Sequence, residues 1–247
     1  MDRLIYSSLA AMRSAMARQT ATANNLANAN TAGFRGEMEN AQSLWLRGPG
    51  MNGRATVSGE VQGADMKNGA VSATGRDLDV ALNGDAMLAV QASDGGEAYT
   101  RRGDLKLTDS GLLVTGDGAP VLGESGPITL PPADSIAIQP DGTITIVPQG
   151  GDPKAPQTVD RLKLASPAGS RIAKGIDGLF RVSGGGALPS DPDATLTAQS
   201  LEGSNVDASR SLVDMIDASR AWETQIKMLT TAQDLDKSTA DLMQLPD

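Results

Sequence analysis

The strongest constraint on the fold is a change in apolar period along the chain. Near the N-terminal end, residues recur at alternating spacings of four and three, which predicts one long amphipathic helix from residue 3 to about residue 29. A coiled-coil-like seam and an ordinary core-packing helix both fit this spacing. The stripe consists of Ile5, Leu9, Met12, Met16, Gln19, Ala23 and Leu26.

A second helical pattern begins after residues 201–205, where Ser204, Asn205 or Asp207 can cap the first turn of a helix from about 207 to 243. Two apolar stripes run along this helix and are displaced around its axis, so we expect it to contact more than one neighbour. One stripe holds Met215, Ser219, Trp222, Ile226 and Leu229, and the other holds Met228, Ala232, Leu235, Thr239 and Leu242.

Between the two helical patterns the apolar period falls to two. Short strands are predicted at 77–82, 86–90, 105–107, 111–114, 135–138, 143–147, 161–164 and 179–182. Pairs typical of tight turns separate several of them, namely Asn83-Gly84, Asp94-Gly95, Asp117-Gly118 and Asp141-Gly142. The middle of the chain is therefore expected to be an all-β domain.

These patterns together predict an α+β fold. Long N- and C-terminal helices are expected to form a coiled-coil-like bundle, with a central all-β domain between them in the sequence. The expected segments are an N-terminal helical assembly segment (1–35), a linker or extended arm (36–75), the β domain (76–185), a linker (186–204) and a C-terminal helical assembly segment (205–247).

Composition excludes several classes of function. The chain of 247 residues has a net charge of -9, which opposes binding to nucleic acid. It holds no run of about 18 apolar residues and no apolar core of a signal peptide, so neither membrane insertion nor an ordinary cleaved signal is expected. Because it contains no Cys and no His, thiolate and imidazole chemistry is excluded, and we predict no catalytic residue, no metal and no cofactor.

Few motifs suggest catalysis. Residues 123–126 (GESG) resemble a nucleophile elbow, but the second Gly comes one position early and no His can serve as the base. Carboxylate pairs alone can hydrolyse glycosides, yet no pair stands out among the 30 acidic residues. The chain is predicted not to be an enzyme, and a periplasmic carbohydrate-active or wall-binding protein is the alternative from another class.

Two motifs at opposite ends carry a family resemblance. Residues 24–34 (NNLANANTAGF) and 201–207 (LEGSNVD) resemble the N- and C-terminal signatures of bacterial flagellar rod and hook proteins. Residues 96–104 and 126–128 also resemble the β domain of that family. Residues 1–6 and 85–90 resemble subunits of the proximal rod, with a distal rod subunit as the alternative, although Met87 stands where the family often has an aromatic residue.

The resemblance implies a structural subunit of the flagellar basal body. Its terminal helices would pack side by side with copies of itself and with rod proteins above and below, forming a hollow tube that transmits torque. The β domain would lie outside this tube in the periplasm. Export would use the flagellar type III apparatus, without a cleaved signal peptide.

This resemblance suggests a role for the asparagines of residues 24–30 at a subunit contact. Their amides can end the helix and still reach a neighbouring subunit, because an Asn both donates and accepts hydrogen bonds. The predicted assembly interface comprises Ile5, Leu9, Met12, Met16, Asn24, Asn25, Leu26, Asn28, Asn30, Gly33, Phe34, Asn205, Met215, Trp222, Ile226, Leu229, Leu235 and Leu242.

Overall fold

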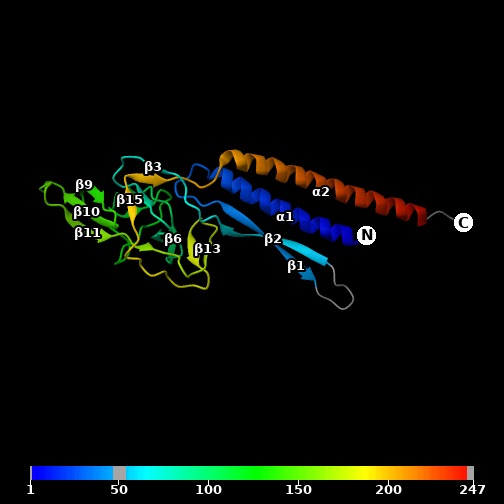
Figure 1. Ribbon diagram of the computed structural model, residues 1–247, viewed down its shortest axis with the longest axis horizontal. Helices are drawn as coiled ribbons and strands as arrows, with labels where there is room; N and C mark the ends of the chain where they lie inside the picture. Colours follow the sequence, from blue (N-terminus) through cyan, green and yellow to red (C-terminus); the bar gives the residue numbers. More distant parts are fainter. Residues whose placement is uncertain (1, 47–53, 244–247) are drawn as a thin grey trace. The chain divides into compact units, whose positions relative to one another are not determined.

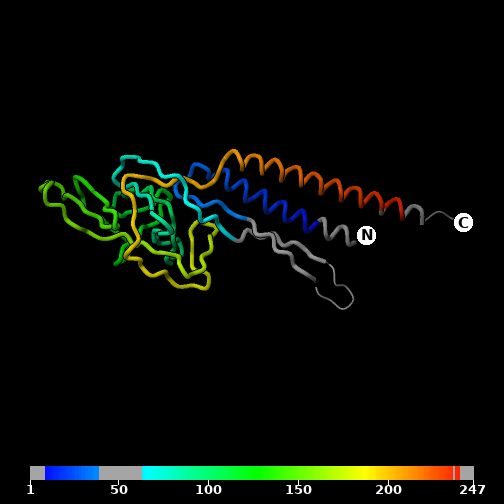
Figure 2. The backbone as a smooth tube through the Cα atoms, viewed as in Figure 1, coloured from blue at the N-terminus to red at the C-terminus, as the bar shows by residue number. Residues whose placement is uncertain are grey.

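The computed structural model describes residues 2–46 and 54–243, and the side chains of residues 9–38, 63–235 and 237–239 (Figure 2). It divides into two units. The helical unit comprises Met1–Ala27, Glu37–Gly63 and Asp207–Asp247, and the globular unit comprises Asn28–Gly36 and Ala64–Val206. Each unit is therefore assembled from segments that are distant in the sequence.

Two long helices dominate the helical unit. Helix α1 (Asp2–Ala27) packs along α2 (Ala208–Met243) and also contacts β1 (Glu37–Leu46), which pairs with β2 (Arg54–Ala64) (Figure 1). Neither helix contains Gly or Pro, so neither is interrupted. Asp207 caps α2, since its Oδ1 accepts hydrogen bonds from the amides of Ser209 at 2.9 Å and Arg210 at 3.2 Å. The two predicted helices are thus present.

The predicted coiled-coil-like bundle is wrong. The described residues contain two helices, packed as a pair, and two large side chains of the predicted seam on α1 remain exposed. Leu9 and Met16 are 42% and 54% exposed. The buried side chains are small instead. On α1 they form two rows with a spacing of seven residues, Ser14 with Ala21 and Ala15 with Thr22, and on α2 Ser211, Ala218 and Ala232 are separated by 7 and 14 residues. Small side chains let two helix backbones approach closely, and this selects a different face from the one the large residues mark.

The globular unit is built from antiparallel sheets (Figure 1). The largest has the order β12 (Leu164–Ala165), β5 (Met87–Gln91), β6 (Glu97–Thr100), β14 (Phe180–Val182) and β13 (Ile172–Lys174). A second has the order β11 (Gln157–Arg161), β10 (Thr143–Pro148) and β9 (Ala133–Ile138). Three strand pairs complete the unit: β4 (Val80–Leu82) with β15 (Leu196–Ala198), β3 (Val71–Ala73) with β16 (Ser200–Glu202), and β7 (Lys106–Leu107) with β8 (Leu113–Val114).

The core of the globular unit lies on both faces of β5. Leu88 and Val90 belong to the larger apolar cluster, while Met87 and Ala89 belong to a smaller one with Tyr99. Successive side chains of a strand point to opposite faces, so this alternation is the expected result of burying both. The sheet is covered on each side, and β5 reads as a continuous apolar run for that reason.

Four predicted turns in the middle of the chain are confirmed. Gly84, Gly95, Gly118 and Gly142 all have positive φ, at 58°, 80°, 92° and 87°. Glycine reaches this left-handed region without a steric penalty, which explains why it follows Asn or Asp in each pair. Residues 36–75, predicted as a linker or arm, carry β1, β2 and β3, and the five segment boundaries stay a prediction.

Candidate assembly site

The predicted interface residues on α1 leave apolar surface uncovered in the single chain. Leu9 and Met16 are exposed, whereas Met12 and Leu26 are half-buried. The side chain of Ile5 lies outside the described residues. Because these residues share a face that differs from the buried one, the predicted stripe is available for a contact outside this chain.

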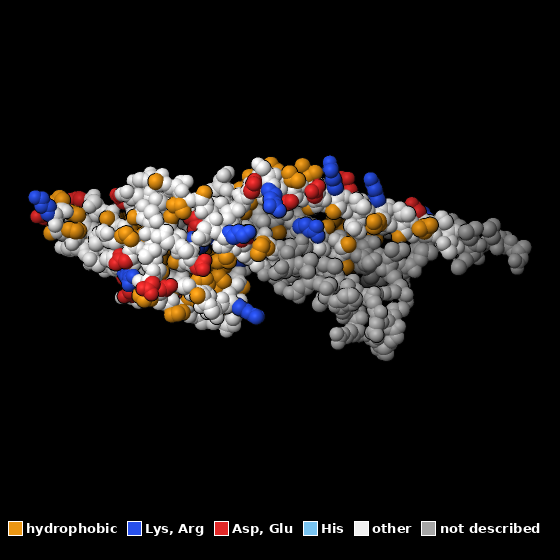
Figure 3. Space-filling view, in the orientation of Figure 1, with side chains coloured by type: hydrophobic (Ala, Val, Ile, Leu, Met, Phe, Trp, Pro, Cys, Tyr) orange, Lys and Arg blue, Asp and Glu red, His pale blue; other side chains and the backbone are white. Residues whose placement is uncertain are grey.

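Helix α2 shows the same property over a greater length. Ile226 and Leu235 are 39% and 56% exposed, while Met215, Trp222 and Leu229 are half-buried. The side chain of Leu242 lies outside the described residues. Further exposed apolar side chains on α2 are Leu212, Val213, Ile216 and Met228. Orange patches lie over α2 in Figure 3. So many large apolar side chains on one helix are typical of a protein–protein contact.

Two asparagines at the end of α1 bind the first residue of β1. Asn25 both donates to the Glu37 carbonyl at 3.0 Å and accepts from the Glu37 amide at 2.7 Å, so its side chain bonds as a neighbouring strand would. Asn24 Nδ2 donates to Glu37 Oε1 at 2.5 Å. These amides therefore fix where β1 begins beside α1, and any additional role at a subunit interface stays a prediction.

The rest of the motif leads into the globular unit. The Thr31 amide donates to the Asn28 carbonyl at 3.1 Å, and the Thr31 hydroxyl donates to Asn28 Oδ1 at 3.2 Å, forming a turn just after α1. Asn30 is exposed and Phe34 is half-buried, with the Lys174 ammonium 3.8 Å from the centre of its ring. This segment thus leaves the helix in a defined turn and is held by the globular unit.

The N- and C-terminal motifs meet within the globular unit. The Gly33 amide donates to the Glu202 carbonyl at 2.7 Å, and the Asn205 amide donates to the Phe34 carbonyl at 3.3 Å. The Gly36 amide donates to Asn205 Oδ1 at 2.8 Å. Arg35, directly after the first motif, and Glu202, in the second, are 167 residues apart in the sequence. The two segments nevertheless form backbone hydrogen bonds as neighbouring strands do.

A third segment completes this junction. The Asn205 side chain donates to the carbonyls of Asp65 at 2.7 Å and Lys67 at 2.9 Å. The Gly69 amide donates to Glu202 Oε1 at 2.7 Å. The side chains of Asn205 and Glu202 therefore join residues 65–69 to the meeting point of the two motifs.

A buried charge cluster lies at the centre of the junction. The Glu202 carboxylate accepts from Arg35 Nη2 at 2.8 Å and from Arg101 Nη2 at 2.6 Å, and all three side chains are at most 2% exposed. Burial lowers the pKa of the Arg101 guanidinium, and the adjacent Glu202 carboxylate opposes that shift. Two buried cations share one carboxylate, so loss of that carboxylate would leave uncompensated charge, which costs about 3 to 5 kcal/mol in buried pairs.

Sequence reasoning found the backbone of this junction but missed its charges. Gly33 and Asn205 were predicted interface residues, whereas Arg35, Arg101 and Glu202 were not. A signal was present in and next to two strands, because Arg101, directly after β6, is two residues from Tyr99, and Glu202 in β16 is two residues from Ser200, and all four are buried. Charged residues in step with buried neighbours on a strand indicate an internal ion pair.

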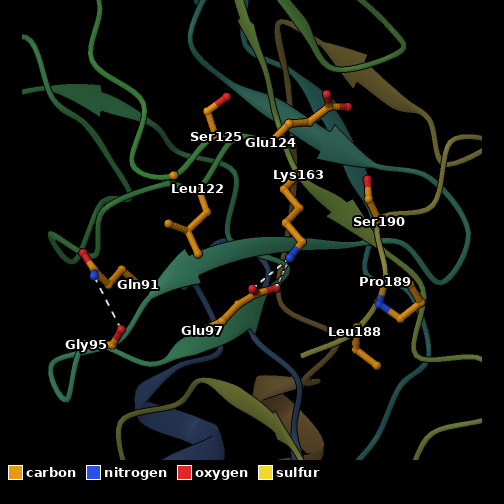
Figure 4. A pocket seen from close by; sticks show the side chains of 12 residues that line it. Gln91, Gly95, Glu97, Leu122, Glu124, Ser125, Lys163, Leu188, Pro189 and Ser190 are labelled. Carbon is orange, nitrogen blue, oxygen red and sulfur yellow. Dashed lines mark hydrogen bonds and ion pairs between the residues drawn. The ribbon is translucent and has the colours of Figure 1, made fainter. Parts of the chain in front are cut away.

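A hollow of about 580 Å³ on the globular unit contains the GESG motif (Figure 4). Lys163 extends toward Glu97, and its Nζ lies 2.7 Å from Oε1 and 2.8 Å from Oε2. Glu124 and Ser125 line the opposite side of the hollow. Glu97 is thus occupied by an ion pair, and Ser125 belongs to a chain that contains no His.

Tyr99 connects this ion pair to the core and gives a prediction about alkaline pH. Its hydroxyl donates to Glu97 Oε1 at 2.7 Å and accepts from the Leu188 amide at 2.5 Å. Burial, followed by the Glu97 hydrogen bond, raises the pKa of Tyr99 above its ordinary value of 10.0. The neutral phenol is favoured in the folded state, so this contribution to stability is complete below pH 10.0 and is lost as pH rises above it.

The chain has two tyrosines, so Tyr6→Phe leaves Tyr99 as its sole phenol. We expect the phenolate absorbance of this variant to appear steeply and well above pH 10, together with loss of β structure by circular dichroism. A gradual titration centred near pH 10 in a protein that remains folded would contradict the prediction. Tyr99→Phe in the wild-type background should remove this contribution to the alkaline loss of stability.

Among the side chains that the structure describes, no cluster of three or more acidic groups is arranged to hold a metal ion. Neither described helix has an apolar stretch long enough to cross a membrane.

Comparison with known proteins gives matches along the chain. Residues 5–35 match the family model "Flagella basal body rod protein", residues 81–146 match "Flagellar hook protein FlgE/F/G D1 domain", and residues 197–242 match "Flagellar basal body rod FlgEFG protein C-terminal". Flagellar basal-body rod protein FlgF of Escherichia coli is 40% identical over 240 residues, covering 95% of each chain. FlgF of Salmonella typhimurium is 38% identical, covering 99% of this chain and all of that one. FlgG of Bacillus subtilis is 30% identical, covering 95% of this chain and 97% of that one.

Proposed function

The chain belongs to the family of flagellar basal-body rod proteins and is a structural subunit of that rod, and we propose that it is built in through the exposed apolar surfaces of α1 and α2. Assembly with other flagellar rod components follows from family membership. What remains to be assigned is the surface that makes the contacts.

The exposure of large apolar side chains on both helices carries the proposal. Leu9 and Met16 on α1, and Ile216, Ile226 and Leu235 on α2, are each 39% exposed or more. Complete burial of such a side chain contributes about 1.5 to 3 kcal/mol. Burial of several of them together against neighbouring subunits would therefore favour assembly.

The family resemblance supplies the rest of the proposal. We assign the subunit to the proximal rod, in a hollow tube that transmits torque, with copies of itself and other rod proteins as neighbours. Delivery through the flagellar type III export apparatus and a periplasmic position belong to the same proposal. A mechanical role without catalysis is consistent with relatives that are named as rod proteins.

The test introduces charge on the exposed apolar surface. Leu9→Glu combined with Leu235→Glu should reduce assembly with partner rod proteins at least about tenfold, because two charges would have to be buried in the contact. Sedimentation and electron microscopy of mixed rod proteins measure assembly, and circular dichroism confirms that the β structure is unchanged.

Matched controls come from polar positions on the same helices. Thr20→Glu combined with Thr231→Glu adds the same charges at exposed polar positions outside the predicted stripes, and assembly should stay near the wild-type level. Normal assembly by the Leu9→Glu and Leu235→Glu variant, or equal loss in the control, would move the contact surface elsewhere on the molecule.

A further inference from the structure

Glu202 belongs to one of the two segments that join the helices to the globular unit. Residues 28–36 follow directly after the end of α1 at Ala27, and residues 200–206 lead directly to Asp207, the cap of α2. Within the globular unit these segments bond to each other through Gly33 and Glu202 and through Phe34 and Asn205. Whatever holds this pair of segments together therefore also acts on the distance between the end of α1 and the start of α2.

The hydrogen bonds of the two arginines are unequal. Arg101 donates to the carbonyls of Leu82 at 2.8 Å, Gly84 at 2.7 Å and Ala86 at 2.7 Å in addition to Glu202. Arg35 donates from Nη2 alone, to Glu202 at 2.8 Å and to Asn68 at 3.1 Å. In the part of the chain that the structure describes, the buried Nε and Nη1 atoms of Arg35 have no acceptor.

The unequal hydrogen bonding of the two arginines predicts which segment would detach if Glu202 lost its charge. Arg101 would keep three carbonyl acceptors and its place in the core. Arg35 would be left as a buried cation with one amide oxygen, which is an unfavourable state for a charged group. Residues 33–36, rather than the sheets, would therefore be the first to leave.

We propose that Glu202 is a positioning residue, whose carboxylate holds residues 33–36 against residues 200–205 and so sets the separation between the end of α1 and the start of α2. The inference rests on the proposed function, since this separation matters to the rod only if the two helices make its contacts. It differs from that proposal because it concerns the globular unit and can be tested in the unassembled chain.

The absence of Cys from the chain makes a direct measurement simple. Ala27→Cys and Ala208→Cys place two spin labels at exposed positions at the end of α1 and the start of α2. We expect one narrow distance distribution in this background and a distribution about twice as wide or more after Glu202→Gln. Hydrogen exchange of β9, β10 and β11 should be unchanged, while exchange of residues 28–36 should rise about tenfold or more.

Glu124→Gln is the matched control, because it removes a carboxylate that is 58% exposed and forms only a 4.0 Å contact with Arg161. Its distance distribution should remain narrow. Arg35→Met provides a second variant that leaves the neutral Arg101–Glu202 pair in place, and it should also broaden the distribution without loss of the sheets.

The outcomes separate the two proposals. A narrow distribution in both Glu202→Gln and Arg35→Met overturns the positioning role. If β9–β11 lose protection after Glu202→Gln, the sheets are disturbed and Arg35→Met becomes the test. An unchanged width of the distance distribution in Arg35→Met would then overturn the positioning role. A broadened distribution in Glu202→Gln together with normal assembly would also overturn the role of Glu202 in the rod. Failure of the proposed function would instead appear as normal assembly of the Leu9→Glu and Leu235→Glu variant.

Discussion

Replacing Gly33 with alanine is expected to lower the free energy of unfolding of the globular unit by about 3 to 5 kcal/mol. Gly33 has φ of +65°, and a Cβ atom there would lie 2.3 Å from the Arg101 carbonyl oxygen and 2.4 Å from its carbon. Both are backbone atoms in the strand region that carries the buried Arg101, so they cannot move aside cheaply. The substitution therefore combines a left-handed backbone penalty with a clash at the junction.

Gly84→Ala separates these two effects. Gly84 also has positive φ, at +58°, but a Cβ atom there would have no atom within 4 Å. Gly84→Ala should therefore lower the free energy of unfolding only by the left-handed penalty of about 1 to 2 kcal/mol. Hydrogen exchange of β5 and β6 at increasing urea measures both changes in the full chain, and equal effects at the two glycines would show that the close approach at Gly33 contributes nothing.

The difference between these glycines illustrates how far sequence reasoning reaches. Asn83-Gly84 was predicted as a turn because the signal is local, and the turn is confirmed. Gly33 was noticed in a motif, but the backbone that crowds it belongs to Arg101, directly after β6 and 68 residues later in the sequence (101 - 33 = 68). Local patterns identify the glycine, and tertiary structure determines the cost of changing it.

The secondary structure shows the same division between what local patterns predict and what tertiary contacts determine. The helices were predicted to within a few residues because their periodicity is long and uninterrupted, and strands such as β5 and β10 were found from apolar runs or alternation. Strands β3 and β16 were missed. Each has three residues and half of the six are polar, so neither shows a clear apolar pattern. They are strands because Val71 pairs with Glu202 and Ala73 with Ser200, far away in sequence.

The candidate interface, too, could be predicted only in part. Spacing located the apolar residues of α1 and α2, but it did not show which helix face is turned inward. That depends on where small side chains allow close approach, and counting large apolar residues gives small ones little weight. The hydrogen-bonded pairs of the motifs, Arg35 with Glu202 and Asn25 with Glu37, could not be predicted from one sequence because nothing local connects their members.

The inward face of α2 gives the second large expected effect. Ala218 is 3% exposed on the face that carries Ser211 and Ala232, and α1 is the element that packs along α2 in this unit. Ala218→Leu inserts three heavy atoms where two backbones approach closely. Overpacking of this kind costs about 1 to 3 kcal/mol, which is large for a helix pair with few buried large side chains.

Amide exchange of residues 10–26 in α1 reads out this change without requiring assembly. It should rise about tenfold or more in Ala218→Leu, since 1.4 kcal/mol corresponds to a factor of ten in an opening equilibrium. Ser219→Leu is the control on the same helix, because Ser219 is exposed and the added side chain can remain in solvent. Its exchange in α1 should match the wild type.

The pair of variants also decides between the two faces of α2. Ser219 belongs to the stripe that sequence spacing marked as the contact surface, whereas Ala218 belongs to the small-residue face that is buried in the structure. If Ala218→Leu opens the helix pair and Ser219→Leu affects only assembly, the small residues hold the subunit together and the large ones hold subunits to each other. The reverse result would place the large-residue stripe inside the subunit and would remove the exposed apolar surface on which the assembly proposal depends.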